Sequence, residues 1–290
     1  MAGEPSPTAG TNWKSRIDLE LVKQVIKWTV YILLLGNFYM YIMEDMHRAA
    51  HSLPPNPSLG EWMVEYSTSI DFLAWIILIG LFELETYVLE DHHFTPVVDK
   101  IMAGMRICCY FFVFHTFYAY STETWKMYTE VEPAGVSSVC EVADQDISFV
   151  SNLRYTDVTS GNCGELSNDS SLFLLEEGIV ITDRENLKLE RILVWMDQIE
   201  VMCWLSIMLL IELVIRLQNR GIAGGRTIEV SNRVKFALYS TIMMLGLYWA
   251  WLDHLLYLWD EFLWIGGFAA IEMNVADWRE ELQQEEESSA

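Results

Sequence analysis

Five ionisable residues lie near one end of the predicted membrane spans, where they could take up a proton or a cation. A carboxyl–histidine cluster that faces a water-filled recess can bind and release protons near neutral pH. The alternative is that these groups lie at the level of the lipid headgroups and are simply hydrated. This outer group consists of Asp71, His115, Glu200, Asp253 and His254.

Acidic and basic residues form an inner group at the other end of the spans, and the stretches between the two groups are almost wholly apolar. Ion pairs such as Glu83 with Arg106, or Glu212 with Lys235, would neutralise charges that lipid cannot solvate and would fix the helix register. Glu212 could instead pair with Arg216 one helical turn later. The functional alternative is that the inner carboxylates bind or relay a cation or a proton. The inner group consists of Glu83, Glu85, Arg106, Glu212, Arg216 and Lys235.

A metal site has one weak candidate set. Glu44, His47 and His51 have the spacing i, i+3 and i+7, which places them on one face of a helix. A solvated helix end is the interpretation we favour, and we predict neither a metal nor another cofactor. The chain also lacks a phosphate-binding loop, a nucleotide fingerprint and a nucleophile elbow.

The composition defines the elements that must position these residues. The chain has 290 residues, of which 52% are hydrophobic, and its net charge of -23 argues against nucleic-acid binding. Its apolar residues gather in blocks long enough to cross a bilayer. We expect an all-α integral membrane protein with five transmembrane helices over residues 28–43, 69–89, 101–120, 198–217 and 233–257.

The charge distribution predicts the orientation. Lysine and arginine lie before the first span, after the second and between the fourth and fifth, which places the N-terminus in the cytoplasm. The acidic segment 121–190 would then be a loop domain of about 70 residues outside a plasma membrane or a bacterial inner membrane. An oxidising compartment favours a disulfide between Cys140 and Cys163 in that loop.

The predicted organisation has five segments. At the ends, a cytoplasmic tail carries an amphipathic helix, and an outer interfacial helix precedes an acidic tail. The apolar stretch 259–273 is short for a span, so it could lie at the interface, fold back onto the bundle or form a sixth span. The segments are a tail (1–27), spans one to three (28–120), the loop domain (121–190), spans four and five (191–257) and the outer helix with its tail (258–290).

An internal repeat connects the spans. At an offset of 129 positions Asp71 matches Glu200, Glu83 matches Glu212, and Arg106 matches Lys235. We expect the second and third spans to form one helical hairpin and the fourth and fifth another, in the same sense. The bland alternative is chance similarity between membrane helices of like composition.

The repeated carboxylates favour a cation or proton channel, transporter or sensor over an enzyme. The bilayer would be its environment, and a homo-oligomer would form a pathway along the shared axis. The second hypothesis is a non-catalytic subunit of a membrane complex, in which the buried charges lock helix packing. A metal-dependent membrane enzyme is the third, and it would need a bound metal or an organic cofactor.

Overall fold

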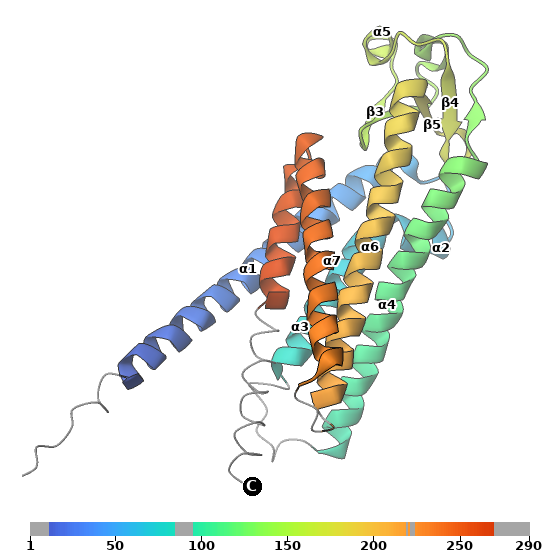
Figure 1. The fold of residues 1–290 in the computed structure, drawn as a ribbon. Helices are drawn as coiled ribbons and strands as arrows, with labels where there is room; N and C mark the ends of the chain where they lie inside the picture. Colours follow the sequence, from blue (N-terminus) through green and yellow to red (C-terminus); the bar gives the residue numbers. More distant parts are fainter. Residues whose placement is uncertain (1–11, 85–94, 219, 221–223, 270–290) are drawn as a thin grey trace, which may run out of the picture.

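The fold is a helical bundle with a small β-sheet at one end (Figure 1). The structure, a computed structural model, describes residues 12–84, 95–218, 220 and 224–269. The acidic tail and the end of the second predicted span lie outside the described residues. The main helices are α1 (Asn12–Ser52), α2 (Leu59–Glu65), α3 (Ser67–Glu83), α4 (Pro96–Thr129), α6 (Arg184–Gln218) and α7 (Arg226–Trp251), followed by a helix over residues 255–269.

Helix α1 is continuous across 41 residues, so the predicted amphipathic helix and the first span are one element. No proline interrupts this stretch, and every residue can donate its backbone N–H to the helix. The helix ends at Ser52, one residue short of Leu53, which precedes Pro54. A residue before proline is disfavoured in the helical conformation, which explains the end point.

Side chains that cap the first turn mark the starts of α2, α4 and α6. Ser58 and Glu61 form a capping box at the start of α2, and the chain bends by 70° between α2 and α3. The Thr95 side chain accepts a hydrogen bond from the Val98 backbone at the start of α4. The Asp183 carboxylate does the same for Asn186 at 2.9 Å, so α6 begins directly after the last strand of the sheet.

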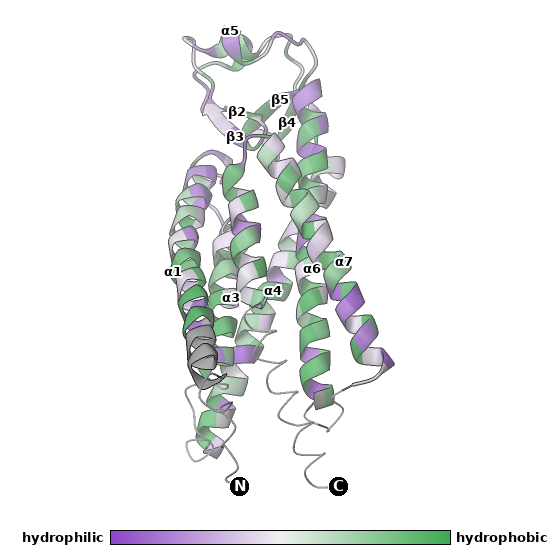
Figure 2. Ribbon diagram, turned by 60° about the vertical axis from the view of Figure 1, so that its left-hand side comes forward, coloured by the Kyte–Doolittle hydropathy of each residue, from purple (hydrophilic) through white to green (hydrophobic). Residues whose placement is uncertain are grey.

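Two segments are long and apolar enough to cross a membrane, Gln24–Ser52 and Arg184–Leu217. The bent pair α2–α3 would add a third if it forms one span. Apolar colours dominate the long helices, whereas hydrophilic colours appear at β3, at α5 and at the start of α7 (Figure 2). These features support a membrane protein, while the number of five spans stays a prediction.

The segment between α4 and α6 contains a five-stranded sheet, which the all-α prediction did not include. The strand order is β1-β4-β5-β2-β3, and only the β2–β5 pair is parallel among these strands. Each strand has two to four residues, too few for a clear alternating pattern. The strands are β1 (Glu132–Pro133), β2 (Ser148–Ser151), β3 (Arg154–Asp157), β4 (Leu172–Leu175) and β5 (Val180–Asp183).

The predicted disulfide between Cys140 and Cys163 is confirmed. It joins the short helices η3 (Val139–Val142) and α5 (Cys163–Leu166). Beside it, Phe149 and Ile181 belong to a hydrophobic cluster that is separate from the core of the helical bundle. The sheet therefore has its own small core, closed by a covalent link.

The helix over residues 255–269 packs into the bundle. Leu263, Trp264 and Phe268 are buried in its main core. A Cβ atom added at Gly267 would lie 3.7 Å from Leu34 and 3.8 Å from Ile79, so α1 and α3 both approach this helix closely. The described part of 258–290 is thus packed against the bundle, and its position relative to the membrane interface stays a prediction. The apolar face of the segment covers other helices, as in the alternative in which it folds back.

Candidate functional site

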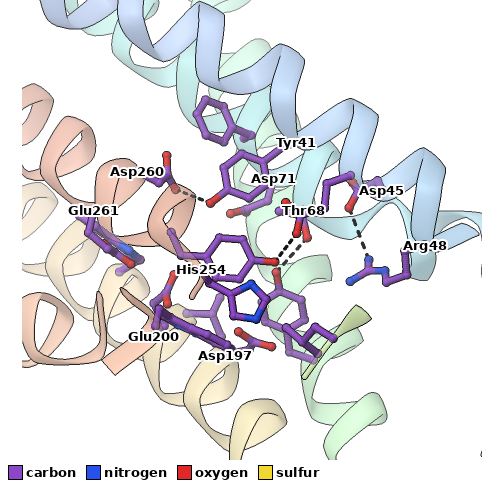
Figure 3. A pocket seen from close by; sticks show the side chains of 18 of the residues that line it. Tyr41, Asp45, Arg48, Thr68, Asp71, Asp197, Glu200, His254, Asp260 and Glu261 are labelled. Atoms are coloured by element: carbon purple, nitrogen blue, oxygen red, sulfur yellow. Dashed lines mark hydrogen bonds and ion pairs between the residues drawn. The ribbon is translucent and has the colours of Figure 1, made fainter. Parts of the chain in front are cut away.

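A cavity of about 510 Å³ lies inside the bundle near the sheet. Its wall is built by α1, α3, α4, α6, the end of α7, the helix over residues 255–269 and the turn between β2 and β3 (Figure 3). Two arginines reach it, against a larger number of carboxyl groups. The acidic side chains in the wall are Glu44, Asp45, Asp71, Glu123, Asp197, Glu200, Asp260 and Glu261.

The same spacing brings four helices to the cavity. Each helix contributes residues at positions i, i+3, i+4 and i+7, which share one helix face. An acidic residue occupies position i+3 in every case, so four carboxylates converge from four directions. The sets are 41, 44, 45 and 48 on α1; 68, 71, 72 and 75 on α3; 197, 200, 201 and 204 on α6; and 257, 260, 261 and 264 on the last helix.

The arginines are held at the sheet side of the cavity. Arg48 forms ion pairs with Glu65 at 2.8 Å and with Asp45 at 3.5 Å. Arg154 pairs with Asp253 at 2.7 Å. Both positive charges therefore already have carboxylate partners, and they leave most of the negative charge of the cavity uncompensated.

Of the eight acidic side chains in the wall, only Asp45 forms an ion pair with a residue in the described part of the chain, and the other seven do not. We call four of these seven the acidic quartet. In a low-dielectric surrounding, unpaired carboxylates repel one another and attract a mobile positive charge. The acidic quartet consists of Asp71, Glu200, Asp260 and Glu261.

Neutral donors orient two members of the acidic quartet. Asp260 accepts hydrogen bonds from Asn37 Nδ2 at 2.5 Å and from Tyr41 Oη at 3.2 Å. Asp71 Oδ2 accepts one from Trp75 Nε1 at 3.1 Å. These bonds fix the position of each carboxyl group without supplying a positive charge.

Some oxygen atoms of the acidic quartet lack hydrogen-bond partners in the described structure. Glu200 interacts with Glu261, which brings two acidic side chains into contact. Glu261 is only 2% exposed, yet its Oε2 atom has no hydrogen-bond partner in the described structure. Asp71 Oδ1 also lacks one within those residues. Buried acceptors are rarely left in this state unless a ligand or water completes them.

Aromatic rings surround the carboxylates. The Phe268 ring centroid lies 5.5 Å from that of Trp75 and 5.2 Å from that of Trp204. Trp264 continues this wall toward Phe72 at 4.8 Å. Aromatic faces carry a negative partial charge, so the wall and the carboxylates favour the same kind of ligand, a cation.

The turn between β2 and β3 closes the sheet side of the cavity, and we call residues 152–154 the cap. Asn152 and Leu153 both have positive φ angles, 55° and 59°, an uncommon conformation for residues other than glycine. Asn152 Nδ2 donates to the Leu252 carbonyl at 2.8 Å, and the Leu153 N–H donates to Glu190 at 3.1 Å. The cap is thus anchored on α6 and on the turn after α7.

The cap also explains the positions of two predicted residues. Asp253 is exposed and binds Arg154, and the hydrogen bond from this guanidinium lowers the pKa of the Asp253 carboxyl. His254 Nε2 lies 3.1 Å from the Asn152 carbonyl, and its ring stacks on Tyr257 with centroids 5.3 Å apart. His254 therefore lines the cavity, whereas Asp253 holds its cap from outside.

The structure brings together only part of the predicted outer group. Asp71, Glu200 and His254 line the cavity. His115 faces a second cavity of about 390 Å³ on the other side of Arg48. His115 therefore lines a different cavity from Asp71 and Glu200, and its role as their titrating partner stays a prediction.

The structure shows partners for two carboxylates of the inner group, Glu83 and Glu212. Glu83 accepts hydrogen bonds from Lys27 Nζ and Tyr31 Oη, both at 2.7 Å, and Lys27 is a partner on α1 that the sequence analysis did not consider. Glu212 pairs with Arg216 on its own helix at 2.9 Å, which confirms the alternative for that residue. Arg106 and Lys235 do not line the cavity, and Lys235 is buried.

The weak metal candidates are divided. Glu44 and His47 line the cavity, and Glu44 accepts a hydrogen bond from Tyr257 Oη at 2.5 Å. His51 stacks on His47 but lies 3.5 Å from Asp157 in the sheet. Within the described ranges, no group of three or more acidic, histidine or cysteine side chains has an arrangement that could hold a metal ion.

Sequence reasoning missed Asp260 and Glu261 as members of the site because they belong to a segment interpreted as interfacial. The repeated spacing was the available signal: Tyr257, Asp260 and Glu261 reproduce the pattern of Tyr41 with its acidic neighbours on α1. Comparison with known protein families, curated proteins and solved structures gave no match. Any functional assignment therefore rests on the chemistry of this cavity.

Proposed function

We propose that this chain is an integral membrane protein that transports or senses protons or cations through the acidic quartet. The observation that carries the proposal is that the acidic quartet, whose members have no basic partner in the described structure, lies in a cavity inside a bundle of apolar helices. Intramembrane carboxylates are costly, and they commonly belong to ion pathways or proton relays. A purely structural role would be served better by paired charges, such as Lys27 with Glu83.

The repeat gives the proposal a second support. Asp71 and Glu200 are matched positions, and so are Trp75 and Trp204, and all four line the same cavity. Two hairpins, α3–α4 and α6–α7, would each contribute one acid and one tryptophan to a site at their interface. Sites between structural repeats are typical of secondary transporters.

The membrane arrangement belongs to the same proposal. The chain would cross the membrane five times, with a cytoplasmic N-terminus and with the sheet on the outer side, in keeping with its basic and acidic segments. The helix over residues 255–269 would enter the bundle from the outer side. The cavity would then lie beneath the outer sheet, and a homo-oligomer is the assembly that we expect.

Flux measurements with reconstituted protein test the proposal. Liposomes that contain Asp71→Asn or Glu200→Gln should lose proton or cation flux by at least tenfold, while folding is retained. The matched control is Glu185→Gln, which neutralises an exposed carboxylate paired with Lys188 outside the cavity. Equal flux in all variants would contradict the proposal.

A non-catalytic subunit is the alternative, and the paired inner charges favour it. The pair Lys27–Glu83 joins α1 to α3, and the pair Glu212–Arg216 lies within α6; neither pair lines the cavity. The disulfide-closed sheet would then dock a partner protein. Gentle solubilisation followed by native mass spectrometry distinguishes a homo-oligomer from a complex with a foreign subunit.

A further inference from the structure

We infer that the cavity binds a protonated primary or secondary amine with an apolar body, an inference that rests on the proposed cation-handling function. The ammonium group would lie among the acidic quartet, and the apolar body would pack against the aromatic wall. Three independent observations lead to this class of ligand: the size of the cavity, its lining, and its buried acceptor atoms.

The size of the cavity suits an organic molecule. About 510 Å³ falls within the range of pockets that hold small molecules, roughly 300 to 1,000 Å³. A bare metal ion needs only a close shell of oxygen atoms at about 2.0–2.6 Å. The helices around this cavity are instead held apart by large aromatic side chains.

The lining combines apolar faces with charge. Phe72, Trp75, Trp204, Trp264 and Phe268 form a wall of rings in mutual contact. Small inorganic cations gain little from such a wall because their hydration is strong, whereas organic ammonium ions are recognised by aromatic faces. The described residues also offer no metal-binding group of three or more ligands.

The acceptor atoms select an amine that retains N–H bonds. Glu261 Oε2 and Asp71 Oδ1 are buried atoms that lack a hydrogen-bond partner among the described residues. An ammonium N–H can donate to such an oxygen in a charge-assisted hydrogen bond, whereas a quaternary ammonium ion has no hydrogen to donate. Glu261 is nearly fully buried, so a ligand that satisfies it must enter the cavity.

The arginines disfavour anionic ligands. Arg48 is occupied by Asp45 and Glu65, and Arg154 is occupied by Asp253. A carboxylate or phosphate group would meet the acidic quartet without a positive side chain ready to accept it. The ligand should therefore carry a positive charge without a matching negative one.

Calorimetric titration of the full-length protein in detergent tests the inference with phenethylamine as the probe. The neutral analogue 2-phenylethanol has nearly the same shape, and tetramethylammonium, sodium and calcium chlorides test the competing cations. We expect phenethylamine to bind at least tenfold more tightly than 2-phenylethanol and than each of these salts. Equal binding of the alcohol, or preference for an inorganic cation, would overturn the inference.

Variants locate the binding site. Asp71→Asn and Glu261→Gln should each weaken phenethylamine binding at least tenfold, whereas the control Glu185→Gln should bind it as the native protein does. If Glu261→Gln does not fold, Trp204→Leu tests the aromatic wall in its place and should also weaken binding. Unchanged affinity in the folded cavity variants would overturn the inference.

The two proposals fail separately. Ion flux that depends on Asp71 and Glu200, in a protein that does not bind phenethylamine, would retain the proposed function and overturn the amine ligand. Amine binding that depends on the acidic quartet, in a protein without flux, would support the inference and limit the function to sensing.

Discussion

Two carboxylates on α3 match two of the carboxylates on α6, and in each helix the two members have different surroundings. Asp71 and Glu83 on α3 are 12 residues apart, as are Glu200 and Glu212 on α6, a rise of about 18 Å. At the inner end, Glu83 and Glu212 each have a basic partner. At the cavity, Asp71 and Glu200 have none among the described residues, although more carboxylates surround them.

The presence or absence of a basic partner distinguishes two roles. We expect paired carboxylates to stabilise the fold and unpaired carboxylates to bind a ligand. A buried carboxylate with a lysine partner is satisfied within the fold, so its removal or that of its partner should change stability. A buried carboxylate without a partner already raises the free energy of the native state, so its removal should change binding. The predictions below address this contrast in order of expected effect.

The largest effect is expected at the inner pair. Lys27→Met should destabilise the protein by about 3–5 kcal/mol, because it leaves Glu83 buried without its positive partner. The side chains of this pair are only 7% and 13% exposed. Thermal melting in detergent measures the change, with Lys188→Met as the control in an exposed pair, where the loss should stay below about 1 kcal/mol. Equal melting temperatures for Lys27→Met and Lys188→Met would show that the buried pair stabilises the protein no more than the exposed pair does.

The second effect distinguishes binding from stability at the cavity. Glu261→Gln should retain or raise the melting temperature, because it removes a buried negative charge that lies against Glu200. The same variant should lose at least tenfold in flux. Melting and flux measured on one preparation check both parts. A large loss of stability would show that Glu261 is a structural residue.

A smaller effect is expected for the intrahelical pair. Glu212→Gln should change stability by less than about 1 kcal/mol, because Arg216 is 71% exposed and water can replace its partner. Thermal melting beside Lys27→Met compares the two inner pairs directly. A loss as large as that of Lys27→Met would indicate that Glu212 holds a second helix.

The smallest effect concerns pH and the cap. The Arg154 hydrogen bond lowers the pKa of Asp253, so this ion pair contributes stability above the ordinary carboxyl pKa of about 3.9. This contribution to stability is lost as the pH falls through the lowered pKa of Asp253 in the folded protein. His254 follows Asp253 directly in the same turn. Asp253→Asn should remove this dependence. The rate of hydrogen exchange at the Leu153 amide, measured as a function of pH, reports the stability of the cap. Identical pH profiles in the native protein and in Asp253→Asn would contradict the prediction.

Part of this site could be predicted from the sequence. Asp71 and Glu200 were found because acidic residues are conspicuous in apolar spans and match at one repeat offset. The disulfide followed from two cysteines in one acidic loop. Both inferences could be made from residue types and their spacing along the chain, without knowing which helices contact one another.

The remaining features depend on which helices meet. Nothing local indicates that Lys27, rather than another base, reaches Glu83 from α1. Asp260 and Glu261 join the site because close contact at Gly246 brings their helix against α7, where an added Cβ atom would lie 3.2 Å from Glu261 Cγ. The sheet was missed because each of its strands is shorter than the window in which a period of two is visible.

The direct junction of β5 with α6 has a mechanical consequence. Strand β5 ends at Asp183 and α6 begins at Arg184, so no loop is available to absorb a rotation of the helix. Strand β2 is hydrogen-bonded in parallel to β5, and it leads directly into Asn152 and Leu153. A rotation of α6 at Glu200 is therefore expected to move β5 and, through the β2–β5 pairing, the cap.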